Sequence, residues 1–475
     1  MLALGAVELV AAIKRGDITA EAYAARALEQ HGRLRHLNAL TWIDEAKVLE
    51  AARTVDLKRQ HGEALGSLAG LPVVVKDNID TVGFPTSAGT GGLKTLMPKF
   101  DAPVAAALWR AGAYLFAKAN MHELAGGGTS SNPAFGAVGN PHDPARIAGG
   151  SSGGTAAALA ARIAPAGLGS DTAGSVRIPS ALSGTAGLRP TIAGGKLYSD
   201  DGMVPLVNNL DTIGPMARNL ADVALLHSTI TGQIVSKGTL KGTRIGVPRA
   251  PYWDDLDDDV RAVSEAALDK LRDAGAVLVD VDWRSMMDAA LPVFQTLLTI
   301  GFKGDLAAYF AHQGLKFDAR EVIERIESRD TKHLFTMSRD AVLSPADAKA
   351  AQTILRTRIQ EQYRELFRSH GISAIAFPSE PMTAPLIAKN GDSFEDEILV
   401  GGKSVSKLFV LIRNTGITCA IGAPGITFPA GLAPNGMPVG LELDGMTGDD
   451  AALLGLGLAA EMAVGPLPAP KLALG

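Results

Sequence analysis

Short apolar runs alternate with amphipathic segments along most of this 475-residue chain. The apolar runs have the length of buried strands, and the amphipathic segments repeat apolar positions with the 3.6-residue period of a helix. Strands are predicted at residues 71–75, 114–117, 243–248, 276–281, 372–377 and 437–443. Helices are predicted at residues 104–110, 155–163 and 257–273, with two short ones within residues 4–30. This alternation predicts an α/β fold whose β-sheet is covered by helices on both faces.

The segment from Ser285 to about residue 370 differs because its pattern is almost entirely helical. Strand signals disappear there, and the segment contains the aromatic residues Phe294, Phe310, Phe317 and Phe335. Two interpretations stay open: ordinary core helices packed against the sheet, or a helical cap that contributes apolar walls to a substrate pocket. Because no linker-like stretch separates this segment from the rest, we expect residues 1–475 to form a single domain.

Charge and cysteine content argue against several classes of protein. The net charge is −5, and no basic cluster marks a surface for nucleic acid or for an anionic membrane. The single cysteine, Cys419, excludes an internal disulfide and a cysteine-based zinc site, and its apolar neighbours predict a buried side chain. The longest uncharged stretch, residues 414–441, is interrupted by glycine and proline, which predicts strand and loop rather than a membrane span. The N-terminal residues lack a signal-peptide pattern, so we expect a cytoplasmic location.

The candidate chemistry comes from two glycine-rich loops and one lysine. Ser151 lies in the loop GGSSGG at 149–154, Ser175 follows DTAG at 171–174, and Lys76 ends an apolar run. Small residues around a serine let its oxygen and the neighbouring N–H groups approach a substrate carbonyl closely. A lysine at the end of a buried strand can lose its proton and act as a base. The pattern therefore predicts a serine hydrolase in which lysine replaces histidine.

Other interpretations of these loops fit the residues less well. The GGSSGG loop lacks the Gly-Lys-Ser/Thr ending of a phosphate-binding loop, and no Gly-x-Gly-x-x-Gly follows a predicted strand. A Ser-His-Asp triad would need a suitably placed histidine, and His122 and His142 are expected to be structural or at the surface. The residues around Ser175 also lack the Gly-x-Ser-x-Gly pattern of a nucleophile elbow.

Taken together, these features resemble the amidase signature family of hydrolases. The motifs that carry the resemblance are VKDN at 75–78, TSSNP at 129–133 with NP at 140–141, GGSSGG at 149–154, GSDTAGSVRIP at 169–179, and GLRPT at 187–191 with LDTIGP at 210–215. The segment 426–440 resembles the family's C-terminal strand, so the resemblance extends over nearly the whole chain. It implies the amidase-signature fold, in which helices cover both faces of a large central mixed β-sheet.

The resemblance also implies roles for individual residues. Ser175 corresponds to the nucleophile, Ser151 to a bridging serine with a cis peptide bond before or at it, and Lys76 to the base. The implied oxyanion hole is formed by the backbone of Thr172, Ala173, Gly174 and Ser175. The implied substrate-binding groups are Ser151 and the backbone carbonyl near Ala125. Neither a metal nor a cofactor is implied.

The chain departs from the family pattern beside the nucleophile. Ala173 stands where the family usually has a glycine. Its methyl group is tolerable if the residue keeps a negative φ, although it would narrow the oxyanion hole. Arg177, the arginine that follows Ser175, belongs to the scaffold in the family pattern, and we expect it to pair with Asp171.

The implied reaction is hydrolysis of an amide-type bond in a small-molecule substrate through an acyl-enzyme. The segments 140–144, 202–206 and 440–445 are most like those of mandelamide and indoleacetamide hydrolases, which release ammonia from aryl-substituted acetamides. Alternatives are an aryl-acylamidase or a hydrazide or carbamate hydrolase. The amidase component of a tRNA-dependent amidotransferase is less favoured, because it would have glutamine where Ile178 stands. We expect no nucleic-acid and no membrane partner, and a homodimer is a candidate assembly.

Overall fold

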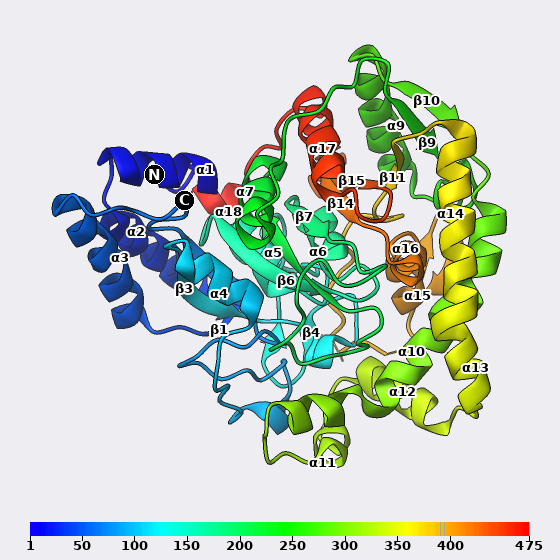
Figure 1. Ribbon diagram of the computed structural model, residues 1–475, viewed down its shortest axis with the longest axis horizontal. Coiled ribbons are helices and arrows are strands. Elements are labelled where there is room, and N and C mark those ends of the chain that lie inside the picture. Colours follow the sequence, from blue (N-terminus) through cyan, green and yellow to red (C-terminus); the bar gives the residue numbers. More distant parts are fainter. Residues whose placement is uncertain (390, 394, 475) are drawn as a thin grey trace.

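A large mixed β-sheet forms the centre of the molecule (Figure 1). The computed structural model describes residues 1–389, 391–393 and 395–474. Within these residues the strands of the main sheet are β1 (Leu40–Trp42), β2 (Pro72–Lys76), β3 (Tyr114–Ala119), β6 (Ala166–Asp171), β7 (Ala186–Arg189), β8 (Thr212–Ala217), β9 (Arg244–Val247), β10 (Val277–Asp280), β11 (Ala374–Pro378), β14 (Gly425–Leu432) and β15 (Pro438–Asp444). Their order across the sheet is β1-β3-β2-β6-β8-β7-β14-β15-β11-β9-β10. The predicted α/β fold with a large mixed sheet is confirmed.

Two short hairpins lie outside the main sheet. One pairs β4 (Ser131–Asn132) with β5 (Gly136–Ala137), and the other pairs β12 (Glu397–Val400) with β13 (Lys403–Ser406). The β4–β5 hairpin follows the short helical turn Glu123–Ala125 in the chain.

Helices cover both faces of the sheet, as predicted. Those preceding residue 284 are α1 (Ala6–Arg15), α2 (Ala20–Arg33), α3 (Glu45–Gln60), α4 (Pro103–Arg110), α5 (Gly153–Ala160), α6 (Arg177–Ser183), α7 (Leu220–Thr231), α8 (Arg249–Tyr252) and α9 (Asp258–Asp273). The C-terminal ones are α15 (Lys407–Ile412), α16 (Gly416–Ile421), α17 (Asp450–Val464) and α18 (Lys471–Leu474). Helices α5 and α6 pack together on β8, β7 and β14, and α7 and α17 pack together on the same three strands. The two pairs therefore occupy opposite faces of the sheet.

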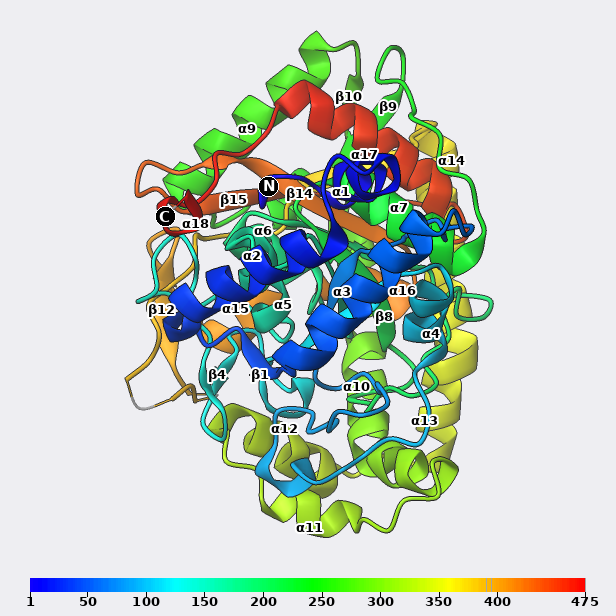
Figure 2. The ribbon, with the colours of Figure 1, turned by 90° about the vertical axis from the view of Figure 1, so that its left-hand side faces the viewer.

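The first helices of the chain pack on its N-terminal side. Helices α2 and α3 lie side by side, and Figure 2 shows them in blue at the front of the molecule. The last residues of the chain return to the same region, where Gln30 Nε2 of α2 donates a hydrogen bond to the Ala473 carbonyl at 3.3 Å. The two ends of the chain are therefore close together in the fold.

The strands that position the candidate residues are parallel neighbours. Strand β2 pairs in parallel with β3 on one side and with β6 on the other. Their carboxyl ends consequently meet at one edge of the sheet, where β2 ends at Lys76 and β6 ends at Asp171. Helix α5 begins directly after Ser152 and packs on both strands. Crevices at the carboxyl ends of parallel strands are the usual place for a ligand site in an α/β sheet.

The segment after residue 284 is helical, as its sequence predicts. It consists of α10 (Arg284–His312), α11 (Ala319–Glu324), α12 (Arg329–Asp340), α13 (Pro345–Ala350), a π-helical turn (Ala351–Leu355) and α14 (Arg356–His370). In Figure 1 it runs along one side of the molecule, coloured from green to yellow. Helix α10 packs against α12, α14 and α16. By length and composition, residues 284–302 of α10 are the one stretch in the described helices that could cross a membrane, although a third of that stretch is buried within the protein.

Most predicted elements lie within two or three residues of their observed bounds, with one exception. The sequence predicts strand and loop for residues 414–441, which contain β14 but also helix α16. The sequence GITCAI of α16 is rich in β-branched residues, which favours a strand locally. Packing against α10 overrides this preference, and Gly422 ends the helix in the left-handed conformation with a φ of 81°.

Candidate active site

Lys76 meets two serine hydroxyls at the carboxyl end of β2. Its Nζ donates hydrogen bonds to Ser151 Oγ at 2.6 Å and to Ser170 Oγ at 2.8 Å. Lys76 and Ser151 are fully buried, and Ser170 is buried on the neighbouring strand β6. Among the described residues no carboxylate lies within ion-pair distance of Lys76. The amine is therefore solvated by hydroxyl groups rather than balanced by a negative charge.

This environment makes the neutral form of the lysine accessible near neutral pH. Burial lowers the pKa of Lys76 to about 7, although the more distant carboxylates of Asp171 and Asp211 raise it. A lysine exposed to water has a pKa of about 10.4, so at neutral pH almost all of it would be protonated and without a free lone pair. With its pKa near neutrality, the Lys76 amine can accept a proton from the hydroxyl that it contacts.

The loop that carries Ser151 is packed tightly against residues 128–130. The peptide bond between Gly150 and Ser151 is cis. The Ser151 carbonyl accepts a hydrogen bond from the His122 N–H at 3.1 Å. A Cβ at Gly150 would lie 2.8 Å from the backbone of Gly128 and Ser130, so only glycine fits there. Backbone contacts of this kind fix the Ser151 hydroxyl beside Lys76.

The loop that carries Ser175 is wrapped around the carboxylate of Asp171. This carboxylate accepts hydrogen bonds from the N–H groups of Gly174 at 2.9 Å and Val176 at 3.2 Å. It also forms ion pairs with Arg177 at 3.1 Å and Arg189 at 3.0 Å, all in a fully buried environment. Burial alone would raise the pKa of Asp171, but the two guanidinium groups keep it well below its usual value. The predicted pairing of Arg177 with Asp171 is confirmed.

These contacts change the expected set of oxyanion donors. The Gly174 N–H, one of the four predicted, is already bonded to Asp171. No hydrogen bond is found in the described part of the chain for the N–H groups of Thr172, Ala173 and Ser175. Gly174 instead has a conformational role, since its φ is 122° and a Cβ would lie 2.1 Å from Thr415 Oγ1. Three of the four predicted N–H groups therefore have no partner among the described residues.

The departure at Ala173 is accommodated by the backbone. Ala173 is not among the described residues with positive φ, so its methyl group causes no backbone strain. Its carbonyl accepts a hydrogen bond from Thr415 Oγ1 at 2.5 Å. Thr415 precedes α16, and the ring of Phe294 from α10 lies against the first residue of that helix, Gly416. An aromatic side chain of the helical segment therefore lies one residue from a group that holds the Ser175 loop.

Ser175 is adjacent to the lysine–serine pair but is not bonded to it through its side chain. It is 7% exposed, and the Ser152 N–H donates to its carbonyl at 3.2 Å. No hydrogen bond of the Ser175 hydroxyl is found within the described residues. The structure consequently brings Lys76 and Ser151 together directly, and it links the Ser175 loop to the Ser151 loop through the backbone.

The loop around Ala125 contacts the helical segment. Leu124 and Ala125 have φ values of 47° and 57°, which non-glycine residues adopt rarely and often near functional sites. His122 is fully buried, and its Nε2 lies 3.2 Å from Asp330 of α12. Burial would lower the pKa of His122, but Asp330 raises it above its ordinary value. This pair is structural, as predicted for His122, and it joins α12 to the loop around Ala125.

The aromatic residues of the helical segment pack in or against the hydrophobic core. Phe302 packs on Phe335 and Phe310 packs on Phe317, with ring centroids 5.0 and 5.6 Å apart. These pairs are ordinary core packing. Phe294 is buried in the same core, where its ring lies against Gly416 of α16, and the cap interpretation stays a prediction.

Sequence reasoning missed one polar side chain that contacts the lysine and a second one that contacts the first. Ser170 accepts from Lys76, and Asn78 Nδ2 donates to Ser170 Oγ at 3.1 Å. Both residues lie inside motifs that carry the resemblance. The signal that could have identified Ser170 is its position near the end of a strand that pairs in parallel with the strand of Lys76. No group of three or more His, Cys, Asp or Glu side chains suited to a metal ion occurs in the described residues.

Comparison with known proteins gives consistent matches over most of the chain. The model of the family described as Amidase matches residues 20–454. Indoleacetamide hydrolase of Agrobacterium vitis is 36% identical, covering 90% of both chains. Mandelamide hydrolase of Pseudomonas putida is 34% identical over 98% of this chain and 92% of its own. A glutamyl-tRNA(Gln) amidotransferase component of Salinispora arenicola is 33% identical over 99% of both. A crystal structure of an amidase superposes with a TM-score of 0.85 at 29% identity, covering 97% of this chain and all of that one.

Proposed function

The chain belongs to the amidase family and is an amide-hydrolysing enzyme, and we propose that it hydrolyses aryl-substituted acetamides through an acyl-enzyme on Ser175. The observation that carries the proposal is the 2.6 Å hydrogen bond between a buried Lys76, whose pKa burial lowers to about 7, and Ser151 Oγ. Lys76, Ser151 and Ser175 form the proposed relay, with lysine as the base that histidine provides in other serine hydrolases.

In the proposed first half-reaction, the neutral Lys76 amine takes the proton of Ser151 while Ser151 takes the proton of Ser175. Ser175 Oγ forms a bond to the amide carbon, and the carbonyl oxygen becomes an oxyanion. The N–H groups of Thr172, Ala173 and Ser175 stabilise that oxyanion, and one such donor can lower the barrier by ~3–4 kcal/mol. The C–N bond then breaks as the proton returns from Lys76 through Ser151 to the leaving nitrogen.

In the proposed second half-reaction, water attacks the acyl-enzyme. Its proton passes to Ser151 and Lys76, and the second tetrahedral intermediate collapses with release of the carboxylic acid. The proton then returns to Ser175 Oγ, which restores the starting state. Every transfer uses groups of this chain and water, so the proposed cycle balances without a further reactant.

The substrate class is supported by two observations. The curated relatives include hydrolases of indoleacetamide and mandelamide, and Phe294 brings an aromatic ring next to the Ser175 loop. The arginines nearest the nucleophile are engaged elsewhere: Arg177 pairs with Asp171 and Glu442, and Arg189 pairs with Asp171. A negatively charged acyl group would find neither of them free, and an unpaired buried charge costs several kcal/mol. A neutral, aromatic acyl group fits better.

The alternatives differ in the leaving group or in the reaction class. Anilides, hydrazides and carbamates would use the same relay with another leaving group. The similarity to an amidotransferase component makes glutamine hydrolysis an alternative function for this chain. Ile178 argues against it, because that component would have glutamine at this position.

A substrate panel tests the proposal. Purified enzyme is incubated with phenylacetamide, indoleacetamide, the corresponding anilide, hydrazide and carbamate, malonamate and glutamine at matched concentrations, and ammonia or amine release is measured. We expect the aryl acetamides to have the highest kcat/KM, with Ser175→Ala as the inactive control. A preference for glutamine or malonamate would overturn the assigned substrate class.

A further inference from the structure

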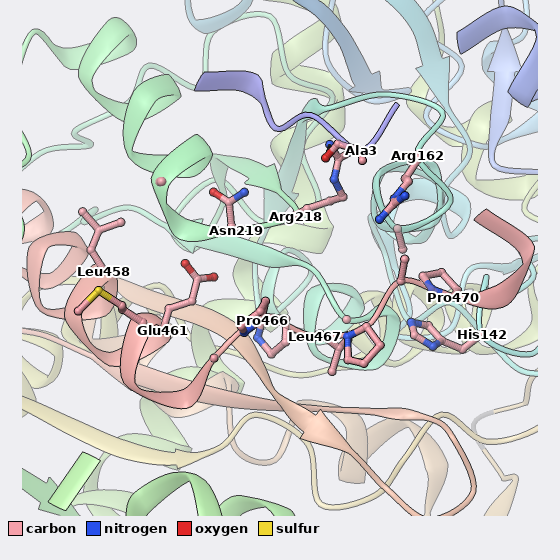
Figure 3. Close-up of a pocket in the computed structure, with 18 of the residues that line it drawn as sticks. Ala3, His142, Arg162, Arg218, Asn219, Leu458, Glu461, Pro466, Leu467 and Pro470 are labelled. Atoms are coloured by element: carbon pink, nitrogen blue, oxygen red, sulfur yellow. Dashed lines mark hydrogen bonds between the residues drawn. The ribbon is translucent and has the colours of Figure 1, made fainter. Parts of the chain in front are cut away.

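A cavity of about 560 Å³ lies near the two chain termini, away from the lysine–serine site (Figure 3). Its walls come from the N-terminal residues, the end of α5, the start of α7, the end of α17 and the segment 465–470. Helix α5 begins next to Ser151 and ends beside this cavity, so the two sites lie at opposite ends of one eight-residue helix. At ~1.5 Å per residue, that helix separates them by roughly 12 Å.

Three cationic side chains line this cavity, and none of them has a carboxylate partner within ion-pair distance in the described residues. Arg218 donates to backbone carbonyls, including Ala164 at 3.2 Å. Lys237 contacts the sulfur of Met462 at 3.0 Å. Arg162 follows α5 with a φ of 57°, a conformation that is uncommon for arginine, and Figure 3 shows its guanidinium extending into the cavity. Its pKa is lowered by burial and by the neighbouring Arg218.

The carboxylates nearby are already engaged. Glu461, the one acidic residue of the cavity wall, accepts the Leu220 N–H with both oxygens at 3.0 and 3.1 Å. Burial raises the pKa of Glu461 to about 7, so it carries only part of a charge at neutral pH. Asp222, outside the wall, accepts from the Val7 N–H at 2.9 Å and from the Asn219 side chain at 3.0 Å. The cavity therefore keeps a net positive charge in a protein whose net charge is −5.

The remaining wall is mostly apolar. Leu458, Pro466, Leu467 and Pro468 contribute side chains that can contact a ring but cannot hydrogen-bond to it. His142 adds one polar atom: its Nε2 is buried without a hydrogen-bond partner, and burial lowers the pKa of His142 to about 4, so the ring is neutral at pH 7. A cavity of this size exceeds what a small inorganic anion needs and matches a ligand of drug-like dimensions.

We propose that this cavity binds an aromatic carboxylate, with the carboxylate between Arg162 and Arg218 and the ring against the proline and leucine side chains. Neither guanidinium group has a carboxylate partner in the described part of the chain, and Arg218 has N–H groups left besides those that donate to backbone carbonyls. Planar guanidinium groups suit the two oxygens of a carboxylate, and an anion relieves the repulsion between two like charges. An aromatic acid is also what the proposed reaction releases. The suggestion that the bound acid is the reaction product rests on that proposed function. The proposed site itself rests only on the cavity and its lining residues.

Binding of phenylacetate, measured by calorimetry on Ser175→Ala enzyme, tests the proposal. Arg162→Gln should weaken one class of phenylacetate sites about tenfold or more, since it removes a charge-assisted contact. Arg162→Lys should weaken it less, and Arg110→Gln, an exposed arginine at the end of α4, should have no effect. Acetate and inorganic phosphate should bind at least tenfold more weakly than phenylacetate, and Arg162→Gln should leave phenylacetamide binding unchanged.

Two results would overturn the proposal. One is that Arg162→Gln binds phenylacetate as tightly as the enzyme with Arg162 does, while circular dichroism shows that the variant is folded. The other is equal or tighter binding of phosphate or acetate, which would show a site for a small anion. If wild-type enzyme fails to hydrolyse aryl acetamides while Arg162→Gln still weakens phenylacetate binding, the site stands and the proposed reaction falls.

Discussion

Two buried lysines on neighbouring parallel strands have opposite surroundings. Val75 of β2 pairs with Lys118 of β3, and Lys76 pairs with Ala119, so the two lysines project from opposite faces of the sheet. Lys118 lies 3.7 Å from the Asp77 carboxylate and donates to the Ile79 carbonyl. Lys76 contacts the hydroxyls of Ser151 and Ser170 instead. Both amines are fully buried, and the difference between them lies in whether a neighbour carries negative charge.

In the proposed mechanism this difference separates a structural lysine, Lys118, from a catalytic one, Lys76. Burial lowers the pKa of Lys118, whereas Asp77 and Asp80 raise it. Burial raises the pKa of Asp80 to about 6, and Tyr309 of α10 donates to this carboxylate at 2.9 Å. The Lys118 side of the sheet therefore ties the loop after β2 to the helical segment. Lys76 contacts two hydroxyls and, at 3.4 Å, the Ser170 carbonyl, and no carboxylate of the described residues. This suits the proton relay that we propose, because a hydroxyl can give up its proton and an ionised carboxylate has none.

Removing the amine of Lys76 has the largest expected effect on catalysis. Lys76→Met should lower kcat/KM for phenylacetamide by about 10³-fold or more, as Ser175→Ala should, because members of one relay act as a unit. The thermal midpoint below pH 7 should stay equal or rise, since the substitution removes a buried amine. Ammonia release and thermal unfolding measure the two effects. If Lys76→Met retained a tenth of the wild-type rate, the lysine would not be the base.

Removing the amine of Lys118 should instead affect stability. Lys118→Met leaves the buried Asp77 carboxylate without its cation and should cost ~3–5 kcal/mol of unfolding free energy. Urea unfolding measures this cost, and Lys118→Met/Asp77→Asn should recover most of it because the uncompensated charge is then removed too. A Lys118→Met enzyme as stable as wild type would show that the carboxylate needs no counter-ion there.

The pH dependence of the rate gives the next largest effect. Because the folded pKa of Lys76 is about 7, kcat/KM should fall about tenfold per pH unit below pH 7 and level off above it. Lys76 loses its proton at a lower pH in the folded protein than in the unfolded one, so the free energy of unfolding of wild type should rise between pH 7 and about 10. The amount by which wild type is less stable than Lys76→Met should therefore shrink over this range. A rate that falls steadily from pH 6 to 9 in folded enzyme would contradict a lysine base.

The hydroxyl partners should have the smallest effect, and they provide a matched pair. Ser170→Ala removes one of two hydroxyls on Lys76 and should lower kcat about fivefold with KM unchanged, the equivalent of one hydrogen bond. Thr86→Val removes a hydroxyl that Lys118 contacts at 3.4 Å and should leave kcat unchanged. Steady-state kinetics measures kcat for both variants. Equal losses of kcat would contradict the claim that only the hydroxyl partners of Lys76 contribute to catalysis.

Much of the fold follows from the sequence pattern, because strand and helix periods are local properties. Helix α16 was missed because its β-branched residues favour a strand and only packing against α10 reverses that preference. The hydrogen bond between Lys76 and Ser151 joins two motifs that could be identified separately. The engagement of the Gly174 N–H by Asp171 could not be foreseen, because it depends on how the loop closes around a carboxylate. The roles of Ser175 and Ala125 stay predictions.

The central claim is that a neutral Lys76 activates Ser175 through Ser151. The most direct test is the rate at which a fluorophosphonate labels the enzyme, followed by mass spectrometry between pH 5 and 9 in wild type and in Lys76→Met. We predict an adduct on Ser175, a labelling rate that rises about tenfold per pH unit up to pH 7, and a rate at least about a hundredfold lower in Lys76→Met. An adduct on another residue of active enzyme, or equal labelling rates in the two proteins, would contradict the account.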